Sequence, residues 1–163
     1  DVGAAKSALQ DVYKSISAMS RPRPQGAYVY FATMALAAGD VAKAELGLAA
    51  IKSDSGPIDE LRAIVAVQKE LLTGKPGAAA QALDARLADI SPANQPLALY
   101  WLGRVKLVSP DADTKKSGLV QLLRIPALYG NQVPEISAAA LSYGVDVLKQ
   151  FDDASARRSR RLN

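Results

Sequence analysis

The chain has 163 residues, which is enough for one domain with a buried core. Hydrophobic residues make up 49% of it and charged residues 22%, with a net charge of +4, so its composition is that of an ordinary globular protein and gives no argument for disorder. The longest apolar runs are too short to span a bilayer, and we expect no transmembrane segment.

Cysteine and histidine are both absent from the chain. Without cysteine there can be no disulfide bond and no thiolate metal site. Without histidine the chain lacks the commonest general base and the commonest metal ligand, together with any Ser-His or Cys-His pair. The residues therefore argue against an enzyme of standard type, and we expect no catalytic residues, no cofactor and no metal.

The first predicted element is a helix from Gly3 to Met19. Its apolar residues recur at helical spacing and share one face, made of Ala5, Leu9, Val12 and Ile16. The stretch from Ser20 to Gly26 contains Pro22 and Pro24, which predict a stiff connector that breaks the helix.

The next stretch, Tyr28 to Pro57, predicts two short helices that fold back on each other. The first presents one apolar face, made of Tyr28, Phe31, Ala32 and Ala35. Gly39 can end this helix in a left-handed conformation, and Asp40 can cap the next one. The second helix again has apolar residues at helical spacing, at Ala44, Leu48 and Ile51. A pair of this length cannot bury its apolar face alone, so we expect it to stack on similar neighbours.

Three more helices are predicted along the next fifty residues or so. Pro57 is expected in the first turn of a helix that runs to about Leu72. In order, the later segments are a turn from Thr73 to Gly77, a return helix from Ala78 to Ile90, and a helix from Gln95 to Val108.

The last third of the chain predicts, in order, a loop at 109–113, a helix at 114–124, a loop at 128–132, and helices at 134–150 and 154–162. Pro126 should end or kink the first of these helices. Asp152 and Asp153 are expected to cap the last one.

One pattern recurs along the chain: a small residue, an apolar residue four positions later, and another three further on. Its copies are Ala5/Leu9/Val12, Ala44/Leu48/Ile51, Ala79/Leu83 and Gly118/Leu122/Ile125, and their first residues are 39, 35 and 39 positions apart. Such intervals are typical of helical solenoids. The small residue allows two helix backbones to approach closely. By this spacing the helix at 3–19 is the second of a unit, which indicates a longer natural chain.

The unit Tyr28-x-x-Phe31-Ala32 … Gly39-Asp40 … Ala44-x-x-x-Leu48-x-x-Ile51 resembles a tetratricopeptide repeat, and Leu102-Gly103 looks like the same first-helix pair in a third unit. The chain departs from that motif at Ala35, where an aromatic is usual, and at Ala63, Ala66 and Val67 of the second unit. The resemblance implies an all-α fold over 1–163. It would be a right-handed superhelix of about three to four antiparallel helix hairpins, and a fragment of a longer protein.

The resemblance also implies function through a surface rather than through catalysis. First helices of successive units would line a concave groove, and the register places six residues there: Val29, Thr33, Ile64, Gln68, Tyr100 and Arg104. We expect a protein-interaction or scaffold module that holds a peptide or a partner helix. Two alternatives stay open: an assembly subunit or spacer that stacks end to end with other repeats, and a helical regulatory domain attached to an enzyme.

Other motifs have simpler interpretations. Arg157, Arg158, Arg160 and Arg161 form a basic cluster that could bind an anionic partner, although a solvated helix face is favoured and nucleic acid is not expected, because no aromatic residues interleave with it. The stretch from Gly74 to Gly77 lacks the rest of a phosphate loop and predicts a turn.

Asp111 and Asp113 lack the other residues of a calcium loop and are expected to cap a helix. Tyr100 and Trp101 are expected to pack between helices. The stretch from Ala98 to Gly103 is similar to segments of envelope-associated repeat proteins of bacteria. Because the same repeats also occur in the cytoplasm, the compartment stays open.

Overall fold

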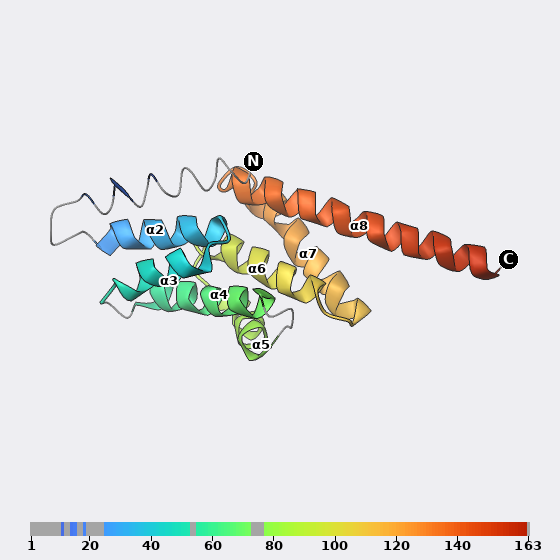
Figure 1. Ribbon diagram of the computed structural model, residues 1–163, viewed down its shortest axis with the longest axis horizontal. Helices are drawn as coiled ribbons and strands as arrows, with labels where there is room; N and C mark the ends of the chain where they lie inside the picture. The colour runs from blue at the N-terminus through green and yellow to red at the C-terminus, as the bar shows by residue number, and fades with distance from the viewer. Residues whose placement is uncertain are drawn as a thin grey trace.

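The computed structural model describes residues 25–52, 55–72 and 77–162, with the backbone alone over 150–162, and four isolated positions at 11, 14, 15 and 18. The described residues form seven α-helices and one 3₁₀ helix and contain no strand (Figure 1). The predicted all-α class is therefore confirmed for this part of the chain. Apart from the four positions, which are helical, the predicted helix at 3–19 lies outside the described residues, and so does its connector as far as Pro24. The connector was predicted to reach Gly26, but Gln25 and Gly26 already belong to the first described helix.

The helices, in chain order, are α2 (Gln25–Ala37), α3 (Val41–Ala49), α4 (Gly56–Leu72), α5 (Ala78–Ala85), the 3₁₀ helix η1 (Leu87–Asp89), α6 (Gln95–Leu107), α7 (Ala112–Tyr129) and α8 (Pro134–Leu162). Each makes its main contacts with helices that are next or next but one in the chain: α2 with α3 and α4, α4 with α5 and α6, α6 with α7 and α8. None of the described helices has the length and apolar composition needed to cross a membrane.

The turn between α2 and α3 forms as predicted. Gly39 has a φ of +78°, the left-handed conformation that glycine adopts without strain. Asp40 caps α3 by accepting a hydrogen bond of 3.1 Å from the backbone N–H of Lys43. Ala32 and Ala44 are fully buried where the two helices meet. The short turn thus brings two small-residue faces together.

Small residues also mark the contact between α6 and α7. A Cβ added to Gly103 would lie 2.9 Å from the carbonyl oxygen of Gly118, and one added to Gly118 would lie 2.7 Å from that of Gly103. Since real Cβ atoms essentially never come this close to backbone oxygens, the two backbones touch at a point where only glycine fits. The predicted role of the small residue at Gly118 is confirmed.

Helix α4 begins with Pro57 in its first turn and ends at Leu72, as predicted, but α5 is shorter than its prediction. The helix expected to run to Ile90 stops at Ala85, and η1 follows. Ile90 is only 3% exposed, and its backbone is extended, with φ −65° and ψ 135°. The chain has to leave the helix to place this side chain in the core, and the Gln95 side chain donates a hydrogen bond to the freed carbonyl of Leu87.

Two boundary predictions in the last third were wrong. Helix α7 continues through Pro126 to Tyr129 instead of ending near Arg124. Proline removes a backbone hydrogen bond, but Ile125 is fully buried and the Tyr129 hydroxyl donates a hydrogen bond to the Gln95 side chain, so tertiary contacts hold this turn in place.

The other error concerns Asp152 and Asp153, which lie inside α8 and do not cap a separate helix. Residues 145–162 contain neither glycine nor proline, so nothing in the sequence interrupts the helix. In Figure 1 the C-terminal half of α8 extends well beyond the other helices.

Helix α6 is the centre of the core. Every residue from Pro96 to Gly103 is buried, and so is Val105. Helices α4, α5, α7 and α8 all contact it, and Figure 1 shows α6 lying between α4 and α7. A helix that is apolar on all sides is stable only when it is covered on all sides. Its central position therefore follows from its sequence.

Candidate partner-binding site

Arg104 of α6 lies among three aromatic rings. Its guanidinium carbon is 4.4 Å from the ring centre of Tyr143, 5.2 Å from that of Trp101 and 5.7 Å from that of Tyr100. One of its terminal nitrogens donates a hydrogen bond of 3.1 Å to the Tyr143 hydroxyl, and the other a long one of 3.5 Å to the Tyr100 hydroxyl. We call these four residues the Arg104 cluster.

Local sequence explains how the cluster forms. Tyr100 and Arg104 are four positions apart, which places them on one face of α6. Trp101 packs edge-on against Tyr100, with ring centres 5.1 Å apart and an interplanar angle of 80°. Trp101 is 3% exposed and Tyr100 8%, which confirms the predicted packing role of this pair. Tyr143 comes from α8, so the site exists only when α6 and α8 lie side by side.

The Arg104 cluster carries a positive charge without a carboxylate. Among the described residues no carboxylate lies within ion-pair distance of Arg104, and its buried Nε has no hydrogen-bond partner. The faces of the three rings offset part of the charge, because aromatic faces are electronegative. Arginine stays protonated at any physiological pH. The arrangement can therefore accept a carboxylate or carbonyl oxygen from outside.

Four further predicted groove residues lie elsewhere. Val29 and Thr33 are half-buried on α2, and the Thr33 hydroxyl donates a 2.9 Å hydrogen bond to the Val29 carbonyl within the helix. Ile64 is fully buried and Gln68 is 2% exposed, so neither side chain of α4 is accessible to a partner in this structure. Their binding role stays a prediction.

Gln68 nevertheless belongs to the surroundings of the cluster. A Cβ added to Gly39 would lie 3.6 Å from the Trp101 ring and 3.9 Å from the Gln68 amide nitrogen, so all three meet beneath the α2–α3 turn. The Gln68 Oε1 and the Trp101 Nε1 are both buried without a hydrogen-bond partner in the described structure. Gln68 of the predicted groove thus lies near Trp101 of the Arg104 cluster, below the surface.

Sequence reasoning missed Tyr143, although a signal for it was present. Tyr143 follows Arg104 by 39 residues, which is one of the intervals that separate the repeated patterns. Extending the register by one more unit would have placed Tyr143 next to Arg104.

The predicted basic patch of Arg157, Arg158, Arg160 and Arg161 falls on α8, but its side chains lie outside the described residues. Its role in binding an anionic partner stays a prediction.

A second polar cluster, around Glu60, was not predicted. Glu60 of α4 is 6% exposed and accepts hydrogen bonds from the backbone and hydroxyl of Ser91 and from the Asn94 side chain, at 3.0 Å for the backbone and 2.9 Å for Asn94. Burial raises the pKa of the Glu60 carboxyl, but the hydrogen bonds from Ser91 and Asn94 and the charge of Arg86 outweigh it. The pKa therefore lies below its ordinary value of 4.5. All its described partners are structural, and the cluster ties α4 to the start of α6.

Asp111 caps α7, as expected. Its carboxylate accepts hydrogen bonds of 2.7 Å from both the side chain and the backbone of Thr114, and these bonds lower the pKa of Asp111. The described residues contain no group of acidic side chains that could hold a metal ion. The expected capping role therefore accounts for Asp111.

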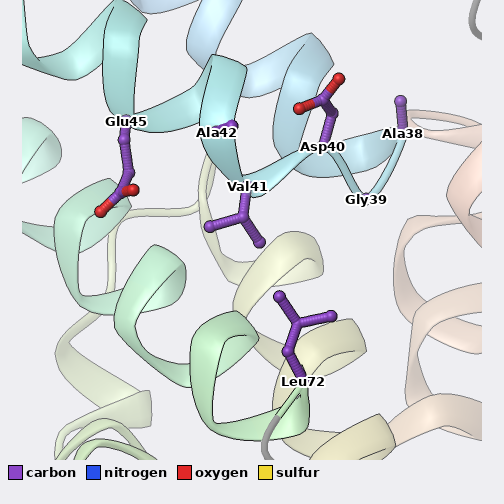
Figure 2. Close-up of a pocket in the computed structure, with 7 residues that line it drawn as sticks. All are labelled: Ala38, Gly39, Asp40, Val41, Ala42, Glu45 and Leu72. Atoms are coloured by element: carbon purple, nitrogen blue, oxygen red, sulfur yellow. The ribbon is translucent and has the colours of Figure 1, made fainter.

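Two hollows lie on the part of the surface that the structure describes. One of about 490 Å³ lies beside the α2–α3 turn, where Figure 2 shows Val41 and Leu72 extending toward each other while the carboxylates of Asp40 and Glu45 lie at separate edges. The other, of about 610 Å³, lies between α5 and the start of α7. Its Asp84 already accepts hydrogen bonds from Lys106 at 2.7 Å and Gln121 at 2.8 Å. Neither hollow brings free polar groups together.

No protein-family model, curated protein or solved structure matches this chain. The candidate site therefore depends on its own geometry: in the Arg104 cluster two predicted groove residues, Tyr100 and Arg104, lie together with an exposed aromatic side chain, that of Tyr143.

Proposed function

We propose that the chain is a tetratricopeptide-like array of helix pairs that binds a protein or peptide partner without catalysing a reaction. In this proposal α2/α3, α4/α5 and α6/α7 are successive hairpins of a right-handed superhelix, and α8 is the first helix of a fourth unit. The contacts of each helix with its next and next-but-one neighbours support this arrangement.

The functional proposal depends mainly on the surroundings of the Arg104 guanidinium. A partly buried guanidinium that is held by three rings and has no carboxylate partner among the described residues gains more from an incoming acceptor than a solvated arginine does. Tyrosine, tryptophan and arginine are also the residues that dominate binding hot spots. Tyr143 is 41% exposed, so a partner can reach the edge of the cluster.

The experiment uses capture from a native extract by the immobilised chain, compared across variants. Arg104→Ala should lose the partners that the unmodified chain retains, whereas Arg124→Ala, which removes an exposed arginine of α7, should retain them. Partners that show this difference are then purified, and calorimetry should find binding to Arg104→Ala weaker by roughly tenfold or more. Circular dichroism and thermal unfolding check that each variant keeps the fold.

Two further variants separate the elements of the site. Tyr143→Phe keeps the ring but removes the hydroxyl that accepts from Arg104, and Arg104→Lys keeps the charge but loses the flat guanidinium. Both should weaken binding less than Arg104→Ala. An affinity that is unchanged by both Arg104→Ala and Tyr143→Ala would contradict a partner site at this cluster.

A further inference from the structure

Helix α8 has an apolar face that no described helix covers. Leu141, Val145 and Leu148 follow one another at helical spacing and are 44%, 46% and 43% exposed. The adjoining face is covered, since Ala140 is fully buried and a Cβ on Gly144 would lie 3.5 Å from side chains of α7. Three large apolar side chains in one exposed row are typical of an interaction surface.

The same face is covered in the earlier first helices. Helix α2 has a large residue followed by a small one at Phe31-Ala32, which are 2% and 0% exposed because α3 packs on them. Helix α6 has Leu102-Gly103 in the same relation to α7. Leu141-Ser142 of α8 lies 39 residues after Leu102-Gly103 and repeats the large–small order. The exposed face of α8 is therefore the one on which a second helix of a unit packs.

The second helices that cover α2 and α6 share one sequence pattern. They bury Ala44 and Leu48 in α3 together with Ile51 just after its end, and Gly118, Leu122 and Ile125 in α7. The pattern occurs once more as Ala5, Leu9 and Val12, in the segment of residues 3–19, of which the structure describes only positions 11, 14, 15 and 18. The sequence thus contains a segment of the covering type that precedes α2, while α8 has no described helix to cover it.

We propose that copies of this chain associate head to tail, with the segment of residues 3–19 of one copy packed on the Leu141–Leu148 face of the next. The segment would lie between α8 of one copy and α2 of its own, just as α3 contacts both α2 and α4, and α7 contacts both α6 and α8. On the side of the segment away from α8, Tyr30 of α2, which is 57% exposed, is available to contact it. An interface of two different surfaces builds open chains or rings.

This inference rests on the repeat register of the proposed function but not on the Arg104 cluster. The two can therefore fail separately. Arg104→Ala should associate as the unmodified chain does even where it loses its partner, and a variant of the end faces should keep the partner.

The test is sedimentation velocity of the full chain over a wide range of concentrations. The unmodified chain should associate more as concentration rises, and both Leu9→Asp and Val145→Asp should stay monomeric. Mixed in equal amounts, the two variants should form a dimer and nothing larger, because each keeps one intact surface. Leu46→Asp, an equally exposed apolar position on α3 outside both surfaces, should associate like the unmodified chain.

Other outcomes would overturn the proposal and identify a different arrangement. If Leu9→Asp still dimerises while the mixture forms no new species, α8 pairs with α8 of another copy. If the unmodified chain is monomeric throughout and Leu9→Asp lowers its unfolding temperature, the segment packs within its own copy. Val145 is exposed, so its replacement should leave circular dichroism unchanged, which excludes misfolding as the cause of a lost association.

Discussion

Helices α6 and α8 both pack against α7, but the structure covers them to very different extents. Eight consecutive residues of α6 are buried, whereas α8 leaves Leu141, Val145 and Leu148 more than 40% exposed. The two sequences differ, because α6 is apolar on all sides whereas α8 carries its apolar residues at helical spacing among polar ones. Their neighbours differ as well: α6 is contacted on both sides, and α8 has described neighbours on one. We expect stability to be concentrated in α6 and association in α8.

The largest effect on stability is expected from alanine substitutions at two helical glycines, one in α6 and one in α8. Gly103→Ala should lower the free energy of unfolding by roughly 1–3 kcal/mol, because its Cβ would lie 2.9 Å from a backbone oxygen and the helices would have to separate. Gly144→Ala should raise it by about 0.5–1 kcal/mol, because the new Cβ meets only ordinary contacts and alanine favours a helix. Denaturant unfolding measures both.

Gly26→Ala is the control for helix propensity alone, since nothing lies within 4 Å of a Cβ at that position. Equal effects of the substitution at Gly103 and Gly144 would mean that the close contact between α6 and α7 does not exist in solution.

The next largest effect on stability is expected at the buried Glu60 cluster. Helix α8 has no described cluster of this kind. Glu60→Gln should lower the free energy of unfolding by about 1–2 kcal/mol at neutral pH, because the amide cannot accept all the bonds from Ser91 and Asn94. The pKa of Glu60 in the folded state lies below 4.5, so its stabilisation is complete above that pH and is lost as pH falls through the folded pKa.

Denaturant unfolding at a series of pH values tests the direction in which the stabilisation by Glu60 changes with pH. The difference between the unmodified chain and Glu60→Gln should be constant above pH 4.5 and should shrink in more acidic solution. Asp89→Asn, which changes an exposed carboxylate nearby, should have little effect at any pH. A Glu60→Gln difference that grows on acidification would show that the sign is wrong.

The smallest effect is expected at the start of α5. Glu70 of α4 accepts hydrogen bonds from the backbone N–H groups of Gly77, Ala79 and Ala80 at 2.8 to 3.0 Å, where Gly77 itself offers no capping side chain. Glu70→Gln should cost about 1 kcal/mol and act locally. Hydrogen exchange should therefore accelerate over residues 78–85 and not in α6. Faster exchange in both helices alike would indicate a global effect instead.

The sequence predicted what nearby residues determine. The turn at Gly39 and Asp40, the start of α4 at Pro57 and the capping by Asp111 depend on residues within a few positions, and each forms as expected. The boundary errors at Ile90, Pro126 and Asp152-Asp153 arose where distant contacts or uninterrupted helix formers outweighed a local signal.

The candidate site was likewise predicted only where it depends on one helix. Tyr100 and Arg104 were predicted from the repeat register, which places both on one face of a single helix, whereas Tyr143 comes from another helix and depends on how α6 and α8 pack. Burial of Ile64 and Gln68 likewise depends on neighbours that their own helix does not specify. Spacing along one helix identifies a face, but it does not identify what lies against that face.

Hydrogen exchange of the full chain at low and high protein concentration tests the contrast between α6 and α8 most directly. The amides of α6 should exchange slowly at both concentrations, while those of residues 138–148 should exchange faster at low concentration and become protected as concentration rises. Equal, slow exchange of the two helices at low concentration, or an α8 whose exchange does not respond to concentration, would contradict a covered centre and an open associating end.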